Sequence, residues 1–472
     1  MSGTTEAPTH PGRVAEVVGA LRQAHPGLEV CPTGTATRAF RFDTGTAPSS
    51  EQPSGTIGPA VAFPASAAEV QTIVRVASEH NVSIVPRGAG TGLSGGASAS
   101  LDQLVVSTER LNRIVEVSPL DGVAVVEPGV INAALNAHLE PLGLFYAPDP
   151  ASWEISTIGG NIATNAGGLR CAGYGVTRES VLRLDVVLAD GSLVSVGHRS
   201  VKGVNGLDLT SLFVGSEGVL GIVVRATVRL RPVPVARRTI SAFFPSTLDG
   251  LDGLDSITLS PVQPTVVEFF DEPSLTAIDA FSRTALRGRG ASLVLVELDG
   301  YGIDEQTADL SAALTAAGAV VTAETDKDGH ALWELRRHGR GQTEPQWFVG
   351  EDIAVPKSRL RDVYSRFAEL EERFDVRVSA VSHAGDGNLH PAITKPIGDA
   401  DPDDRPASLD EAATELVRIA LAVGGTVTGE HGIGTVKREW AALELSPRHL
   451  AAQRALKDAL DPAGLFNPGK AI

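Results

Sequence analysis

Apolar positions along residues 67–90 follow one period and then change to another. "AAEVQTIVRVASEH" has apolar residues three and four apart, which predicts an amphipathic helix. "NVSIVPRGAG" continues as a short β-branched strand that runs into a glycine loop. Similar strand patterns with turn residues between them follow at 104–108, 122–129 and 181–197. We therefore expect residues 12–235 to form one α+β domain.

A second domain is expected after a proline and arginine cluster, "RLRPVPVARR" at 229–238. Beyond it, "VVEFFD" (266–271) and "ASLVLVELDG" (291–300) have the character of strands, while "RLRDVYSRFAELEERF" (359–374) has that of a helix. This order predicts an antiparallel sheet with helices on one face, over residues 236–472. The fold class of the whole chain is then α+β.

Composition limits the partners. The chain has 472 residues, of which 42% are apolar and 21% charged, as is ordinary for a globular protein. Its formal net charge of -17 argues against binding to nucleic acid or to an anionic lipid surface. Small ligands are therefore the expected partners.

The few cysteines and the lack of a long apolar stretch exclude further classes of protein. The two cysteines, Cys31 and Cys171, exclude a disulfide framework and a cysteine-ligated iron-sulfur cluster on this chain. Electrons, if any move, must therefore leave through another partner. The start "MSGTTEAPTHPG" lacks the features of a signal peptide, and no apolar stretch approaches the ~20 residues that a membrane helix requires. We expect a cytoplasmic protein without a membrane span.

Two glycine runs suggest a phosphate-containing ligand. "VPRGAGTGLSGGA" (85–97) contains the spacing GxGxxG, but it leads into a strand rather than a helix, which argues against a Rossmann loop, and it lacks the Walker lysine. Backbone N–H groups in such a run can still converge on a pyrophosphate, helped by Arg87. The second run, "STIGGNIATNAGGLRCAGYG" (156–175), suits a longer ligand. The alternative is that both runs are tight turns in a β-rich domain.

A histidine pair flanks a predicted hairpin turn. In "SHAGDGNLH" (382–390), Asp386 and Gly387 predict a two-residue turn between strands. That register places His383 directly opposite His390, with Cβ atoms about 4.5–5.5 Å apart. Two imidazoles at this separation could share one metal ion, which would need a third ligand. The alternative is a hydrogen-bonded pair on a sheet.

Several motifs, in order along nearly the whole chain, resemble those of one family. They are "VPRGAGTGLSGG", "GGNIATNAGG", "DVVLADG", "VGSEGVLGIV", "SHAGDGNLH", "TGEHGIGTVKREW" and "DPAGLFNPGK". Together they resemble the FAD-dependent D-2-hydroxyacid dehydrogenases of the vanillyl-alcohol oxidase superfamily, which include D-lactate, glycolate and D-2-hydroxyglutarate dehydrogenases. The resemblance implies a two-subdomain PCMH-type FAD-binding domain, followed by an FAD-linked oxidase C-terminal domain that binds substrate and metal.

The resemblance also implies which residues contact FAD. Neither glycine run contains a histidine for covalent attachment, so the FAD is expected to be non-covalent. The implied cofactor residues are Arg87, Gly88, Ala89, Gly90, Thr91, Gly92, Gly95, Gly96, Gly160, Asn161, Gly167, Gly168, Glu217, Gly221, Ile222 and Asn467.

For the chemistry, the resemblance assigns His383, His390 and Glu430 as metal ligands and His431 as the catalytic base. Two histidines and a carboxylate suit Zn²⁺ with an open position, and also Mn²⁺ or Fe²⁺. Such a cation makes a hydroxyl easier to deprotonate, so that a neutral imidazole can take its proton while hydride leaves for the flavin. The alternative is that Glu430 and His431 form an exposed turn.

The substrate expected from this resemblance is a small 2-hydroxy acid, with Arg336 in "LWELR" binding its carboxylate. The D-2-hydroxyglutarate branch has a lysine and an asparagine roughly where this chain has Gly350 and Ala392, which favours a short monocarboxylate such as D-lactate or glycolate. D-lactate is the main expectation. Glu351 and Asp352 are expected near the site without an assigned role. The external electron acceptor would be a quinone, a cytochrome or an electron-transfer flavoprotein, which could hold the protein at a membrane surface. The alternatives are a subunit of a glycolate-oxidising complex and a D-2-hydroxyglutarate dehydrogenase, and a homodimer is compatible with each.

Overall fold

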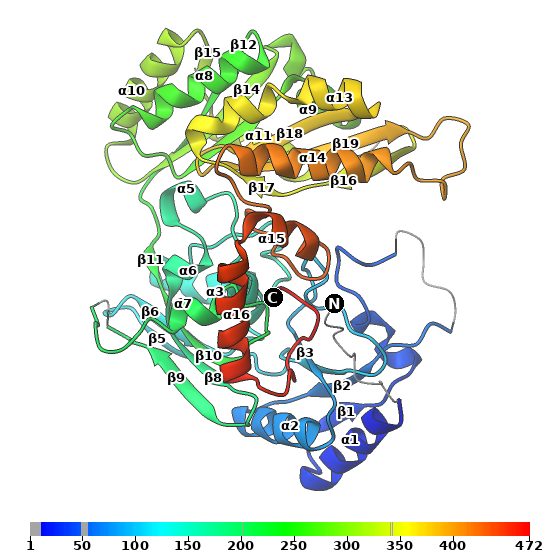
Figure 1. The fold of residues 1–472 in the computed structure, drawn as a ribbon. Helices are drawn as coiled ribbons and strands as arrows, with labels where there is room; N and C mark the ends of the chain where they lie inside the picture. Colours follow the sequence, from blue (N-terminus) through cyan, green and yellow to red (C-terminus); the bar gives the residue numbers. More distant parts are fainter. Residues whose placement is uncertain (1–10, 49–54, 201, 340, 342) are drawn as a thin grey trace. The chain divides into compact units, whose positions relative to one another are not determined.

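The computed structural model describes residues 11–48, 55–200, 202–339, 341 and 343–472 (Figure 1). The first ten residues, on which the expectation of a chain without a signal peptide depends, lie outside this range. The chain forms two compact units that are not two continuous halves. The first unit comprises Met1–Ala166, Val176–Pro232 and His431–Ile472, and the second comprises Gly167–Gly175 and Val233–Glu430.

The first unit contains a four-stranded sheet. Its strand order is β1-β2-β4-β3, with β2 and β3 both parallel to β4. The helix predicted from the 67–90 pattern is confirmed as α2, and Ser66 caps its start by accepting a hydrogen bond from the Glu69 N–H. The elements are α1 (Pro11–Ala24), β1 (Glu29–Cys31), β2 (Ala60–Phe63), α2 (Ala67–Glu79), β3 (Ile84–Arg87) and β4 (Leu104–Ser107).

A five-stranded antiparallel sheet completes the first unit, with the order β5-β6-β10-β8-β9. Its strands are β5 (Ile114–Ser118), β6 (Val123–Val126), β8 (Val181–Val187), β9 (Leu193–Gly197) and β10 (Ile222–Arg229). The smaller elements are α3 (Asn132–Leu139), β7 (Leu144–Phe145), α4 (Ile158–Thr164), α6 (Thr177–Ser180), α7 (Thr210–Phe213) and β11 (Arg231–Pro232).

The C-terminal segment belongs to the first unit because its backbone joins the four-stranded sheet. It contains α15 (Arg438–Glu444) and α16 (Pro447–Leu460). After α16, the Ile84 N–H donates to the Leu465 carbonyl and the Asn467 N–H donates to the Ile84 carbonyl, both at 2.8 Å. Phe466, which lies between these two residues, is fully buried. Burial of this aromatic ring and the paired backbone hold the tail against β3.

The second unit is built on one antiparallel sheet, as predicted. Its strand order is β15-β12-β14-β13-β18-β19-β16, with β17 paired to β19. The strands are β12 (Arg237–Phe244), β13 (Val266–Phe270), β14 (Ser292–Asp299), β15 (Val320–Ala323), β16 (Gln346–Gly350), β17 (Ile353–Ala354), β18 (Arg377–His383) and β19 (Asn388–Pro396). The helices are α5 (Cys171–Tyr174), α8 (Thr247–Thr258), α9 (Glu272–Ser282), α10 (Ile303–Ala316), α11 (Asp326–His338), α12 (Leu360–Tyr364), α13 (Phe367–Phe374) and α14 (Ser408–Ala422).

Helices lie on both faces of this sheet, with α9 and α11 on the face opposite α8. A Cβ at Gly250 of α8 would lie 2.7 Å from the Phe269 ring, so α8 approaches the face to which Phe269 points. On the opposite face, Leu332 and Trp333 of α11 pack in a cluster with Phe270. Successive residues of a strand point to opposite faces, so α11 covers the face that also carries Glu268. This face holds the candidate site.

Within the described part of the chain, no helix has both the length and the apolar character that a membrane-crossing helix needs.

Candidate active site

Three side chains from distant parts of the sequence converge in the second unit. His383 ends β18, His390 lies on β19, and Glu430 lies in the loop between α14 and α15. The Oε1 atom of Glu430 is 3.3 Å from Nε2 of His390 and 3.7 Å from Nε2 of His383. The ligand atoms of the three residues lie within 4.8 Å of one another. The structure therefore brings together the three predicted metal ligands.

The predicted hairpin register is wrong. His383 pairs with Asn388, and His390 pairs with Val381, so the two histidines are diagonal neighbours on one face rather than direct partners. The loop spans residues 384–387, and its last residue, Gly387, has a φ of +85°. A Cβ there would also lie 2.1 Å from the Val355 carbonyl oxygen. The segment that contains Val355 therefore packs closely against the longer turn, and local sequence does not reveal this contact.

The diagonal arrangement still keeps the imidazoles together. Their ring centroids are 5.0 Å apart and their planes are inclined by 88°. Diagonal neighbours on a sheet remain within reach of long side chains. Two rings at nearly right angles can direct separate nitrogen lone pairs toward one point, which is the arrangement that a shared ligand position requires.

Asp352 holds the loop that carries Glu430. This fully buried carboxylate accepts hydrogen bonds from the Thr428 hydroxyl at 2.6 Å, the Gly429 N–H at 2.9 Å and the Glu430 N–H at 3.1 Å. The Asn388 side-chain amide donates to it at 2.7 Å. Several donors to one carboxylate fix its position strongly. The sequence predicts Asp352 near the site without assigning it a role. Its contacts show that it holds the backbone of residues 428–430 in place.

Glu268 is a residue that sequence analysis missed. It lies directly opposite His383 in the β13–β18 pairing and is fully buried. Its Oε1 is 2.5 Å from Nδ1 of His383, and its Oε2 accepts a hydrogen bond from Nε of Arg336. The available signal was a carboxylate in the centre of the apolar run "VVEFF", since a buried acid needs partners.

The protonation of the cluster is uneven. Burial lowers the pKa of His383, but the charges and hydrogen bonds of Glu268 and Glu430 outweigh burial and raise the pKa to about 10. Burial lowers the pKa of His390, although Glu430 accepts a hydrogen bond from its ring and acts in the opposite direction. Burial raises the pKa of Glu430, but the two histidines dominate and hold it well below its usual value. Without a metal, the cluster is therefore a charged carboxylate between one protonated and one neutral imidazole.

The chemistry of these donors fits a divalent cation. Imidazole nitrogens and a carboxylate are ligands of Zn²⁺ and of several transition metals. A metal-bound histidine commonly donates its other ring N–H to a carboxylate, and Glu268 occupies that position for His383.

The first glycine run forms a cradle in the first unit. The carbonyls of Gly90 and Gly92 accept hydrogen bonds from the backbone of Thr44 and Gly45 at 3.1 and 3.0 Å. Because a planar peptide directs its N–H opposite to its carbonyl, the next amides point away from this segment. A Cβ at Gly95 would lie 2.2 Å from the Thr435 hydroxyl, and this glycine has a φ of +84°. Backbone amides at a surface where side chains would not fit suit a pyrophosphate.

A second observation fits a flavin in this unit. The side-chain nitrogen of Asn161 is buried and has no hydrogen-bond partner among the residues that the structure describes, so it can donate to a bound group. Asn161 belongs to α4, and a Cβ at Gly88 would lie 2.3 Å from the Thr157 hydroxyl that caps this helix. The two glycine runs are therefore side by side, as a ligand spanning both requires.

Two predicted cofactor residues, Arg87 and Asn467, form hydrogen bonds to backbone carbonyls of or near the first glycine run. Arg87 donates to the Ala97 and Ala39 carbonyls at 2.9 and 3.1 Å. The Asn467 amide donates to the Gly96 and Glu217 carbonyls at 3.0 and 2.7 Å. These hydrogen bonds stabilise the loop and connect the C-terminal tail to it.

Glu217 positions the backbone that follows His431. Its buried carboxylate accepts from the Ile433 N–H at 2.8 Å and the Gly434 N–H at 2.7 Å. The Ser94 hydroxyl donates to the carbonyls of His431 and Gly432 at 3.0 and 2.9 Å. The residue predicted as the base is thus held within the first unit.

Other predicted cofactor residues are divided. Ala89, Thr91 and Gly160 lie in the first unit, as do Gly221 and the buried Ile222, whereas Gly167 and Gly168 belong to the second. A Cβ at Gly167 would lie 2.6 Å from Oε2 of Glu430. The structure therefore places Gly167 against a predicted metal ligand.

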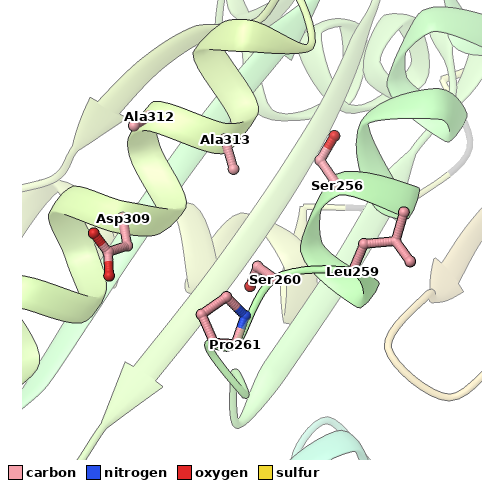
Figure 2. A pocket seen from close by; sticks show the side chains of 7 residues that line it. All are labelled: Ser256, Leu259, Ser260, Pro261, Asp309, Ala312 and Ala313. Carbon is pink, nitrogen blue, oxygen red and sulfur yellow. The ribbon is translucent and has the colours of Figure 1, made fainter.

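A surface hollow lies elsewhere in the second unit, between the end of α8 and α10 (Figure 2). It is lined by small and apolar side chains, with Asp309 as its one titratable group. None of the predicted site residues lines it.

Two family models match consecutive parts of the chain. Residues 59–197 match the FAD binding domain family, and residues 233–471 match the family of FAD linked oxidases, C-terminal domain. The chain is 38% identical to the glycolate oxidase subunit GlcD of Bacillus subtilis (strain 168), over 87% of this chain and 88% of that protein. It is 32% identical to the D-lactate dehydrogenase of Archaeoglobus fulgidus, over 94% of this chain and 97% of that protein.

A solved structure shows the same fold. The crystal structure of p-cresol methylhydroxylase with substrate bound aligns over 98% of both chains, with a TM-score of 0.78 and 17% sequence identity. The α+β PCMH-type fold is thereby confirmed. With both family models matched in order and relatives above 30% identity along most of the chain, this protein belongs to the FAD-linked oxidases and is an oxidoreductase of their 2-hydroxyacid dehydrogenase and oxidase group.

Proposed function

We propose that this protein oxidises glycolate to glyoxylate with non-covalently bound FAD and a divalent cation, Zn²⁺ in the first instance. The observation that carries the proposal is the convergence of His383, His390 and Glu430 around one point. The relative at 38% identity is described as a glycolate oxidase subunit, which favours glycolate over the D-lactate that the sequence suggested.

The cluster would hold the cation, which would polarise the substrate hydroxyl and lower its pKa. FAD would supply the two-electron acceptor for the α-hydrogen. Arg336 would bind the substrate carboxylate through its Nη atoms, since its Nε already donates to Glu268. His431 would take the hydroxyl proton. It follows Glu430 directly, so the two Cα atoms are about 3.8 Å apart.

One pair of residues, Gly350 and Ala392, favours a substrate with a single carboxylate. Gly350 of β16 and Ala392 of β19 are direct partners, and Ala392 shares a face with His390 two residues earlier. These are the positions where the D-2-hydroxyglutarate branch has polar residues. Their absence here removes partners for a second carboxylate, which favours a monocarboxylate.

The electron acceptor would be a separate protein or a quinone. Two relatives, at 38% and 34% identity, are named as glycolate oxidase subunits, so we propose that this chain also works as a subunit. D-lactate oxidation is the second candidate, supported by the D-lactate dehydrogenase at 32% identity.

Anaerobic flavin reduction tests the function. The purified protein, loaded with FAD and Zn²⁺, is mixed with glycolate, D-lactate, L-lactate or D-2-hydroxyglutarate without an acceptor. We expect glycolate to bleach the flavin absorbance fastest, with D-lactate slower and the other two inactive. Preference for D-lactate would establish the second candidate, and no bleaching by any of the four acids would overturn the proposal.

A further inference from the structure

The buried carboxylate of Glu268 contacts two parts of the proposed site at once. It lies in the middle of β13, where Val267 and Phe269 on either side are buried against the other face of the sheet. A buried ionised carboxylate is unfavourable unless it is paired and hydrogen-bonded. Glu268 satisfies this condition with two partners, one at each oxygen.

The contact with His383 determines which ring nitrogen can face the ligand cluster. Because Oε1 of Glu268 accepts a hydrogen bond from Nδ1, the proton of a neutral His383 remains on Nδ1 and the lone pair is on Nε2. Nε2 is the atom that lies 3.7 Å from Glu430. The carboxylate thereby sets both the tautomer and the orientation of this ring.

The contact with Arg336 fixes a guanidinium that is only 5% exposed. Arg336 lies on α11, one turn after Leu332 and Trp333, whose side chains pack on the sheet. Trp333 also donates from Nε1 to the Thr239 hydroxyl at 3.0 Å. Packing thus sets the helix, and Glu268 sets the guanidinium at its end.

We propose that Glu268 is a positioning residue shared by the metal ligand His383 and the carboxylate-binding Arg336, so that one buried side chain aligns both contacts to the substrate. The inference rests on the proposed function for the role of Arg336. Its first part, the control of metal affinity through His383, is independent of which acid the protein oxidises.

Metal affinity provides the test. Zn²⁺ binding to the FAD-loaded protein is measured by competition with a chromophoric chelator, alongside flavin content and the kcat and KM for glycolate. We expect Glu268→Gln to weaken Zn²⁺ binding about tenfold to a hundredfold and to raise KM, with flavin content unchanged. Arg336→Met should raise KM but change Zn²⁺ affinity by less than about threefold, because Glu268 still holds His383.

A matched control separates positioning from general damage. Glu324 is also a buried carboxylate of this sheet region, paired with Arg289 at 3.2 Å and with the Ser241 hydroxyl. Glu324→Gln should lower thermal stability without weakening Zn²⁺ binding. If Glu268→Gln does not fold, the Glu268→Gln/Arg336→Met variant removes both buried charges and should still bind Zn²⁺ at least about tenfold more weakly.

Wild-type Zn²⁺ affinity in whichever of these two Glu268 variants folds would overturn the inference. That result would leave the proposed function intact if glycolate still reduced the flavin. A different pair of results would contradict the proposed function but support the role of Glu268 at His383. In that case the wild-type protein oxidises no 2-hydroxy acid, and the Glu268→Gln variant binds Zn²⁺ more weakly than wild type.

Discussion

The proposed flavin cradle of the first unit consists mainly of backbone, whereas the proposed metal-ligand cluster of the second consists of side chains. The cradle is largely backbone, shaped by glycines such as Gly88 and Gly95, where a Cβ would meet neighbouring atoms. The cluster is made of side chains, His383, His390 and Glu430, that come from two strands and a loop. A backbone site fails when a side chain is added, whereas a side-chain site fails when one is removed. The two should therefore be separable by mutation.

One loop is common to both regions, and each unit anchors its own part of it with a buried carboxylate. Asp352 accepts from the N–H groups of Gly429 and Glu430, and Glu217 accepts from those of Ile433 and Gly434. The chain passes from the second unit to the first at the bond between Glu430 and His431. The proposed metal ligand Glu430 and the proposed base His431 are thus positioned by independent contacts.

Removing a ligand should have the largest effect. His390→Ala leaves the cluster with two ligands, and we expect kcat/KM for glycolate to fall by more than about a hundredfold, beyond the loss typical of residues that only support a ligand. Metal analysis should show loss of the bound ion, with FAD content unchanged. A variant that keeps both the metal and the activity would contradict the assignment of His390.

Adding a side chain to the cradle should produce the opposite result. Gly95→Val places a β-branched residue at a φ of +84°, with its Cβ 2.2 Å from the Thr435 hydroxyl. Strain of this kind costs about 1–3 kcal/mol, so FAD affinity should fall about tenfold to a hundredfold, with Zn²⁺ affinity retained.

Gly143→Val is the matched control, because exposed Gly143 also has a positive φ, +67°, but lies outside the cradle, and a Cβ there would meet nothing within 4 Å. FAD affinity should stay within about threefold of wild type, as expected of a surface site away from the cofactor. Equal losses in the two glycine variants, measured by flavin fluorescence titration, would contradict a cradle shaped by close backbone contact.

The loop anchors should give intermediate effects. Asp352→Asn weakens the contacts that hold Glu430, and hydrogen bonds to a charged group contribute about 1.5–3 kcal/mol, so Zn²⁺ affinity should fall about tenfold. Glu217→Gln should leave Zn²⁺ affinity within about threefold, since it affects only the segment after His431. Chelator competition checks both, and equal losses would show that the anchors do not act separately.

The smallest effect concerns Lys470, whose amine donates to the Gly96 carbonyl at 3.1 Å. Burial lowers the pKa of Lys470 to about 8, below its ordinary value of 10.5. Between these values the unfolded chain binds the proton more tightly, so this group adds stability as pH rises through the window. The unfolding free energy of wild type, relative to Lys470→Met, should therefore increase from pH 8 to pH 10. A difference that is constant or falls over this range would contradict the lowered pKa.

Local sequence patterns were sufficient to predict much of this structure. The helix and strand before the first glycine run follow directly from residue periodicity. The motifs around His383, His390 and Glu430 marked the cluster by resemblance. What the sequence did not reveal depends on contacts between distant segments. Glu268 is 115 residues from His383, and no local pattern indicates that β13 and β18 are neighbours.

The hairpin register failed for the same reason. Asp386 and Gly387 are ideal for a two-residue turn, yet the loop is longer, with Gly387 against the Val355 carbonyl. Likewise, the glycine run around Gly167 looked continuous with Gly160, but the chain leaves the first unit after Ala166. Tertiary packing decided both outcomes.

The most direct test of the central claim is anomalous diffraction from crystals of the Zn²⁺-loaded protein, recorded on both sides of the zinc absorption edge. The account predicts one strong anomalous peak per chain, coordinated by Nε2 of His383, Nε2 of His390 and the carboxylate of Glu430. A peak at other residues would contradict the account. So would the absence of a peak at this cluster when the same protein binds zinc in solution.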